Sequence, residues 1–134
     1  ILETTLKDGK RLALPKCKNN FDEMDFYLVN SLSQLEKGAF SIMEPNPEVC
    51  EKYEDFSHGL CLVPGLCFDM QGFRLGVGKG DYDRFLQNFS GTSVGLCYSK
   101  CIEHTLPSGV FDRPVDAVIT EKYTNRTNNE FVKE

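Results

Sequence analysis

The feature that most constrains this chain is a glycine-rich segment between an apolar stretch and an amphipathic one. Residues 60–68 are the most apolar part of the sequence, broken only by Pro64-Gly65, and predict a buried strand that runs into a bend. Residues 74–80 form a loop with glycine at 76, 78 and 80. Residues 81–89 predict a helix with one core-facing side, because apolar residues recur there at helical spacing: Tyr82, Phe85, Leu86 and Phe89. Such an order of strand, loop and helix can bind anions through its outward-pointing backbone amides.

The spacing within this loop fits neither of two well-known nucleotide motifs. No Gly-Lys-Ser/Thr follows four spacer residues, as a Walker A loop requires, and the third glycine of a Rossmann fingerprint would fall at Asp81. Lys79 and Arg74 nevertheless supply positive charge suited to phosphate. Asp83, in the first turn of the helix, could take one coordination position on a phosphate-bound Mg²⁺. Spacing alone therefore predicts an anion-binding loop, and a glycine-rich turn with solvated charges is the alternative.

The rest of the chain predicts short strands that alternate with helices, which favours an α/β sheet. We expect a helix over residues 1–7, closed by Asp8-Gly9, and a short capping-box helix from Ser33 to Gly38. Residues 44–47 hold two prolines and predict a stiff, non-helical connector. The expected strands cover residues 11–14 (stopped by Pro15), 24–29, 92–99 and 115–120. Residues 122–134 are polar and are expected to fray.

Composition narrows the classes of partner and cellular location. The 134 residues fit one domain, and the formal net charge of -5 argues against nucleic-acid and membrane partners, because those surfaces are anionic. No apolar run reaches the roughly 18 residues that span a bilayer. The six cysteines lack the second ligand pair of a zinc set, so we expect inert thiols and a cytoplasmic location. A metal site or a disulfide framework is the alternative, and two Asn-x-Ser/Thr triplets, at Asn88 and Asn125, point towards a secreted protein.

Two motifs in the glycine-rich segment resemble the signature of the 5-formyltetrahydrofolate cyclo-ligase family. They are Pro64-Gly65-Leu66-x-Phe68-Asp69 and Gly72-x-Arg74-Leu75-Gly76-x-Gly78-x-Gly80-x-Tyr82-Asp83. The resemblance extends over most of the chain, through Gly9-Lys10, Leu14-Pro15, Met24-x-Phe26, Leu35-x-x-Gly38, Ile42-x-Glu44-Pro45 and the segment from Pro114 to Glu121. It implies an α/β fold, a three-layer, Rossmann-like sandwich with a mostly parallel sheet. We expect residues 1–121 to form one such domain and residues 122–134 to form a polar C-terminal tail.

This resemblance implies an enzyme that uses ATP and Mg²⁺ to close 5-formyltetrahydrofolate to 5,10-methenyltetrahydrofolate, with release of ADP and phosphate. The ATP contacts would come from one continuous strip: Arg74, Leu75, Gly76, Val77, Gly78, Lys79, Gly80, Asp81 and Tyr82. The folate would meet Gly78, Lys79, Gly80, Tyr82 and Met24, and the catalytic residues would be Arg74, Lys79 and Tyr82. The metal would be held by Asp83 and Asp116, although Asp116 could instead be a strand-entry residue satisfied by backbone amides. We expect a monomer or a weak homodimer.

The sequence departs from the family pattern in two places. The family has a helix and a first strand before the point where this chain begins, with a Lys and an Arg for ATP and a Glu for the pterin. We therefore expect an N-terminally incomplete domain that is less stable or relies on a partner. Asp81 stands where the family often has another tyrosine, and it could strengthen metal binding, repel phosphate or cap the helix. Two alternatives to the enzyme follow: a non-catalytic nucleotide- or folate-binding relative, and a small α/β enzyme on another substrate, such as a phosphosugar.

Overall fold

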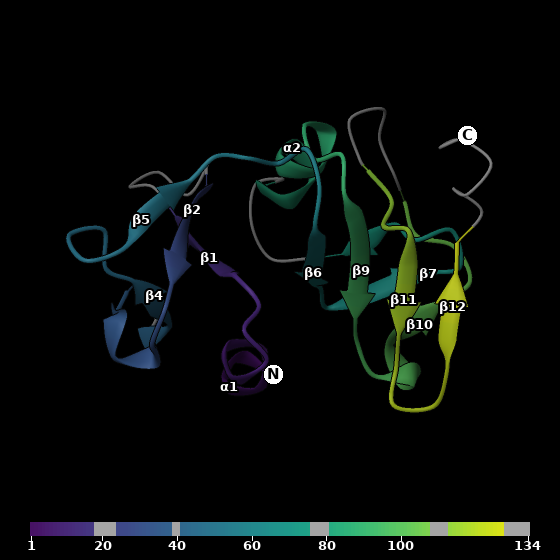
Figure 1. Cartoon of the computed structure of the whole chain (residues 1–134). Coiled ribbons are helices and arrows are strands. Elements are labelled where there is room, and N and C mark those ends of the chain that lie inside the picture. Colours follow the sequence, from purple (N-terminus) through teal and green to yellow (C-terminus); the bar gives the residue numbers. More distant parts are fainter. Residues whose placement is uncertain (18–23, 39–40, 76–80, 108–112, 128–134) are drawn as a thin grey trace. The chain divides into compact units, whose positions relative to one another are not determined.

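The computed structural model describes residues 1–17, 24–38, 41–75, 81–107 and 113–127, which belong to two compact units, residues 1–55 and 56–134 (Figure 1). In the first unit, helix α1 (Leu2–Lys7) ends at Asp8, and Gly9 follows with φ +73°, as the Asp8-Gly9 pair predicts. The unit is built on an antiparallel sheet of three strands, in the order β1-β2-β5. These are β1 (Leu12–Cys17), β2 (Met24–Val29) and β5 (Glu51–Tyr53).

Strand β1 continues through the proline that was expected to stop it. Pro15 lies opposite Phe26 in the ladder with β2, and the strand runs on to Cys17. The expectation of a stop at Pro15 is therefore wrong. The reason is that β1 lies at the edge of its sheet, where a residue without an N–H is tolerated.

The capping-box helix expected from Ser33 to Gly38 is also wrong. A short 3₁₀ helix, η1 (Leu32–Gln34), is followed directly by strand β3 (Leu35–Lys37), which pairs antiparallel with β4 (Met43–Pro45). The N-cap is Ser31, whose hydroxyl accepts the Ser33 N–H at 3.3 Å. A capping box would need Glu36 to reach back to the backbone. That carboxylate instead lies 3.6 Å from the ammonium of Lys16 on β1.

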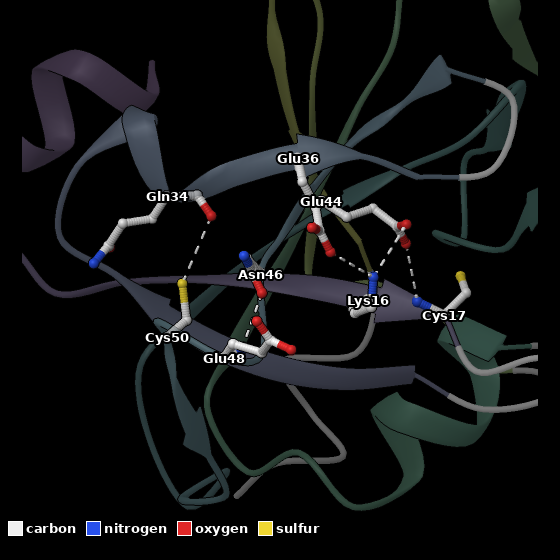
Figure 2. Close-up of polar contacts among 8 residues, drawn as sticks. All are labelled: Lys16, Cys17, Gln34, Glu36, Glu44, Asn46, Glu48 and Cys50. Carbon is white, nitrogen blue, oxygen red and sulfur yellow. Dashed lines mark hydrogen bonds and ion pairs between the residues drawn. The ribbon is translucent and has the colours of Figure 1, made fainter.

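Glu44 ties the β3–β4 hairpin to the end of β1, as Figure 2 shows. Its Oε1 lies 3.6 Å from Lys16 Nζ, and its Oε2 accepts the Cys17 N–H at 3.3 Å. A side chain at Gly38 would overlap the Glu44 carboxylate, so the glycine allows this approach. The connector expected over residues 44–47 is non-helical, but its first two residues belong to strand β4.

The second unit contains a four-stranded sheet whose centre is parallel. Its order is β12-β11-β9-β6, formed by β6 (Leu60–Pro64), β9 (Thr92–Leu96), β11 (Ala117–Ile119) and β12 (Thr124–Arg126), which lie side by side in Figure 1. Strands β6, β9 and β11 are parallel, and β12 returns antiparallel to β11. Helix α2 (Asp81–Gln87) lies on the crossover from β6 to β9, as parallel neighbours require. The helix expected over residues 81–89 is thus confirmed up to Gln87.

The chain leaves the four-stranded sheet at Gly65-Leu66 and enters a second sheet of this unit. Strand β7 (Cys67–Asp69) pairs antiparallel with β8 (Arg74–Leu75) and parallel with β10 (Ile102–Glu103), which follows the 3₁₀ helix η3 (Ser99–Cys101). The predicted strand with a bend over residues 60–68 is therefore confirmed as two strands that belong to different sheets.

The core of the second unit forms around Phe68, which is fully buried with Val63, Val115 and Val118. Tyr82 and Leu86 of α2 pack against this cluster, as their helical spacing predicts. Gly95 makes room for the Phe68 ring, because a Cβ at this position would lie 2.5 Å from the ring Cζ. The apolar run, the helix and strand β9 thus meet at one aromatic side chain.

The expected α/β class is confirmed in its coarse form, a mixed sheet with helices. The expectation of a mostly parallel sheet is wrong for the part of the chain that the structure describes, where five strand pairings are antiparallel and three are parallel. Several neighbouring strands are joined by connections too short for a parallel crossover. The described helices include none that is long and apolar enough to cross a membrane.

The polar segment after residue 121 does not fray over its first part. Thr120 Oγ1 accepts the backbone N–H of Lys122 and of Tyr123, and this turn leads into β12. The buried hydroxyl of Thr127 donates to the Val115 carbonyl at 2.8 Å. The expectation of fraying is therefore wrong for Thr124–Arg126, which form β12. Hydroxyl and backbone hydrogen bonds replace the apolar contacts that the sequence lacks.

Candidate active site

The turn between β7 and β8 is organised by a buried carboxylate. Asp69 is 1% exposed, and its Oδ1 accepts the N–H groups of Gln71 at 3.0 Å and Phe73 at 2.9 Å. Its Oδ2 accepts the Leu106 N–H at 2.9 Å, which ties the turn to the segment after β10. Gly72 completes the turn with φ +93°. Because Arg74 follows Phe73 directly, this turn determines the position of the Arg74 backbone, the first residue of the candidate site.

Arg74 is held at the entry to the glycine-rich loop by two contacts. Its Nε donates to the Pro64 carbonyl at 2.9 Å, and its guanidinium carbon lies 5.0 Å from the centre of the Tyr82 ring. Tyr82 comes from α2, so the two residues flank residues 76–80 on either side in the sequence. Within the part of the chain that the structure describes, no carboxylate forms an ion pair with Arg74. Its charge is thus available for an anionic ligand.

The two predicted metal ligands belong to different elements of the second unit, and each accepts a backbone hydrogen bond. Asp83 Oδ1, in the first turn of α2, accepts the Arg113 N–H at 3.1 Å. Asp116 Oδ2, just before β11, accepts the Ser93 N–H at 2.8 Å and lies 3.3 Å from the Ser93 hydroxyl. The backbone contact anticipated for Asp116 as a strand-entry residue is thus present. A carboxylate offers about four acceptor positions, so these bonds are compatible with metal binding.

Several predicted site residues lie outside the described residues or in the other unit. Gly76, Val77, Gly78, Lys79 and Gly80 are outside the described part of the chain, and so is the side chain of Asp81. Leu75 is described and is 52% exposed. Met24 lies at the start of β2 in the first unit. The roles assigned to these residues therefore stay predictions.

The six cysteines are free thiols. Burial raises the pKa of Cys61 to about 11. Burial also raises the pKa of Cys67, with further contributions from Glu103, Cys101 and Asp69. Such thiols stay protonated near neutral pH and are poor nucleophiles. The described residues contain no group of three or more His, Cys, Asp or Glu side chains that could hold a metal ion.

A family model matches residues 1–121 of this chain, and it describes the 5-formyltetrahydrofolate cyclo-ligase family. The chain belongs to this family. The 5-formyltetrahydrofolate cyclo-ligase of Mus musculus is 31% identical over 90% of this chain and 65% of its own length. That of Escherichia coli K12 is 30% identical over 90% of this chain and 68% of its own length. The chain thus spans just under two thirds of the length of several curated cyclo-ligases.

A solved structure shows the same family likeness in three dimensions. The 5,10-methenyltetrahydrofolate synthetase of Aquifex aeolicus superposes with a TM-score of 0.79 and 41% sequence identity. The match covers 95% of this chain and 63% of the synthetase chain. The predicted family assignment is therefore confirmed, and so is the α/β class in its coarse form.

The role of one cyclo-ligase motif residue was missed in the sequence. Asp69 is part of the motif Pro64-Gly65-Leu66-x-Phe68-Asp69, but sequence reasoning gave it no function. The available signal was an acidic residue that ends an apolar run, three positions before a glycine. Asp is favoured at such positions because its carboxylate accepts backbone N–H groups in the following turn. The contact with Leu106 has no local signal, because the two residues are 37 positions apart.

Proposed function

We propose that this chain carries out the ATP- and Mg²⁺-dependent closure of 5-formyltetrahydrofolate to 5,10-methenyltetrahydrofolate, with release of ADP and phosphate. The observation that carries the proposal is the position of Arg74, which a carbonyl and an aromatic ring hold at the entry to the family's glycine-rich loop. A guanidinium held in this way is oriented before an anionic ligand arrives, so less side-chain entropy is lost on binding.

The reaction needs a leaving group, because the formyl oxygen does not depart by itself. The formyl oxygen attacks the γ-phosphorus of ATP, and ADP leaves. N10 of the folate then attacks the activated carbon and loses its proton, and phosphate departs with the former formyl oxygen. Both steps build negative charge on phosphoryl oxygens, so positioning and charge neutralisation can supply most of the catalysis. No covalent enzyme intermediate is required.

In this proposal the loop and its flanks bind the triphosphate and the folate. Arg74 and Lys79 neutralise phosphoryl charge, and the amides from Leu75 to Asp81 line the phosphates. Tyr82 orients Arg74 and, with residues 78–80, contacts the folate. The raised pKa of Cys67 supports the expectation that this thiol is not a nucleophile in the ring closure.

Asp83 and Asp116 are the proposed Mg²⁺ ligands. Both offer the oxygen donors that this ion prefers, and the backbone N–H groups that bind them would orient the carboxylates. Mg²⁺ usually takes one or two carboxylates together with phosphate oxygens and water, so a pair of aspartates suffices. When bound, the ion would offset charge on the phosphates.

The finer features of the fold and the setting are part of the same proposal. We place β6, β9 and β11 at the parallel centre of a three-layer, Rossmann-like sandwich. The free thiols support a cytoplasmic location, and the net charge of -5 supports a protein that binds neither nucleic acid nor membranes. We propose a monomer or a weak homodimer.

The test is the appearance of methenyltetrahydrofolate absorbance when the polypeptide meets 5-formyltetrahydrofolate, ATP and Mg²⁺. The proposal predicts product only when all three are present. The test variant is Arg74→Met, which removes the charge and should abolish product formation. Its matched control is Arg113→Met, which removes an exposed arginine side chain but keeps the backbone N–H that Asp83 accepts. Nucleotide binding without product would refute the proposal and favour a non-catalytic relative.

A further inference from the structure

Three of the six cysteines, Cys67, Cys97 and Cys101, lie near one another in the second unit. Cys67 begins β7, Cys101 ends η3, and Cys97 follows β9. All three thiols are partly exposed. Burial raises the pKa of Cys97, and the neighbouring Cys101 and Cys67 raise it further, while Cys101 also contributes to the raised pKa of Cys67. The proposed reaction uses none of these groups.

Two of them, Cys67 and Cys101, lie at the start of the same pair of strands. Strands β7 and β10 are parallel, with Phe68 opposite Ile102 and Asp69 opposite Glu103. Cys67 and Cys101 each directly precede the first of these paired positions. Neighbouring strands lie about 4.8 Å apart. Disulfides form between Cα atoms roughly 4.4 to 6.8 Å apart, so this register suits a cross-strand bond.

Side-chain direction supports the same pair. Phe68 and Ile102 both pack in the core, so their side chains share one face of the β7–β10 pair. Because side chains alternate along a strand, Cys67 points to the opposite face, together with Asp69 and Glu103. The influence of Glu103 and Asp69 on the Cys67 pKa agrees with this placement. Cys97 instead packs against the core cluster.

We propose that Cys67 and Cys101 are a redox-modification site that forms a reversible disulfide. With glutathione disulfide as oxidant, one thiolate attacks the oxidant to give a mixed disulfide and one glutathione. The second cysteine then displaces the other glutathione. The protein loses two protons and two electrons, and the oxidant gains both as two glutathione thiols. A reversible bond of this kind is the usual form of a disulfide in a reducing compartment.

Protonation sets how fast this oxidation proceeds. The raised pKa of Cys67 keeps its thiol protonated near neutral pH, so oxidation at this residue accelerates as the pH rises. The bond would lie beside the candidate loop, because Cys67 is opposite Leu75 in the β7–β8 ladder. The proposal itself does not depend on the proposed function, since its test needs no substrate.

The test is a disulfide map of the intact chain after incubation with glutathione disulfide. Trypsin cleaves after Lys100, so it releases Cys97 and Cys101 on separate peptides, whereas Cys67 shares its peptide with Cys61. Fragmentation of the crosslinked peptide then distinguishes Cys67 from Cys61. We expect a bond between Cys67 and Cys101, with the mass of two hydrogen atoms lost and restored by dithiothreitol.

The matched variants are Cys97→Ser, which should keep the crosslink, and Cys101→Ser, which should abolish it. The crosslink should also raise the Tm by roughly 10 °C, reversibly, because it closes the chain between residues 67 and 101 and so restricts the unfolded state. A bond that joins Cys101 to Cys97 or Cys61 would overturn the assignment. So would the absence of any bond in a chain whose Cys67 and Cys101 both react with an alkylating reagent while it is folded.

Discussion

Replacing Asp69 with Asn should destabilise the second unit strongly, because the change removes the charge from a buried acceptor of three backbone N–H groups. The amide oxygen of Asn can keep the bonds from Gln71 and Phe73, but as neutral hydrogen bonds. The amide nitrogen would then face the Leu106 N–H, so that bond is lost. Hydrogen bonds to charged groups contribute about 1.5 to 3 kcal/mol and neutral ones about 1. Relief of the desolvated charge offsets part of the loss. We therefore expect the free energy of unfolding to fall by roughly 2 to 4 kcal/mol.

Urea unfolding followed by far-ultraviolet circular dichroism measures this loss. With an m value of about 2 kcal/mol/M, the Cm should fall by roughly 1 to 2 M. Asp8→Asn is the matched control, because Asp8 is exposed at the end of α1, and its effect should stay within about 0.5 kcal/mol. If Asp69→Asn were as mild as Asp8→Asn, the carboxylate would not hold the β7–β8 turn in place.

Four further predictions follow from the geometry. Gly72→Ala should lower the free energy of unfolding by about 2 to 4 kcal/mol, because its φ is positive and its Cβ would lie 2.5 Å from a backbone carbonyl; Gly9→Ala, with open space around it, should lose only about 1. Tyr82→Leu should raise the KM for ATP roughly 3- to 10-fold, whereas Tyr82→Phe keeps the ring under the arginine and should change it less than about 2-fold. Burial raises the pKa of the Cys61 thiol to about 11, whereas the unfolded-state pKa is about 8.5. The contribution of this thiol to the free energy of unfolding is therefore present below about pH 8.5 and is lost as the pH rises through about 11. Cys61→Ala should reduce the dependence of the free energy of unfolding on pH between these two values. Asp83→Asn should lower Mg²⁺-dependent turnover at least 10-fold with little change in Tm, and unchanged turnover would refute its metal role.

Sequence patterns predicted the elements whose determinants are local. The helical spacing of Tyr82 and Leu86 is intrinsic to α2, and both residues pack on the core as expected. The Asp8-Gly9 ending of α1 and the whole of β2 depend likewise on neighbouring residues. Such patterns hold because no distant group competes with them.

The missed elements depend on residues far away in the sequence. Glu36 matched a capping box, but Lys16, from another strand, binds its carboxylate, and the chain is extended there. Strand β12 was missed because it has no apolar pattern. Hydroxyl groups of Thr120 and Thr127, on either side of the strand, hold it in place. Pro15 was misread because its place at a sheet edge follows only from the topology.

The candidate site was predicted through the family motif rather than through local physics. The motif placed Arg74 and Tyr82 on either side of the loop, and the structure adds the contact between them. The hydrogen bonds that hold Asp83 and Asp116 come from Arg113 and Ser93, which lie 30 and 23 positions away. Partners at such distances cannot be read from spacing, so their geometry had to come from the fold.

The central claim is that this chain couples ATP cleavage to folate ring closure. The most direct test is to quantify ADP and 5,10-methenyltetrahydrofolate in the same reaction mixture over time. The account predicts that the two products accumulate in equal amounts and that neither forms when 5-formyltetrahydrofolate is left out. ADP release that does not depend on the folate, or ring closure without ATP, would contradict it.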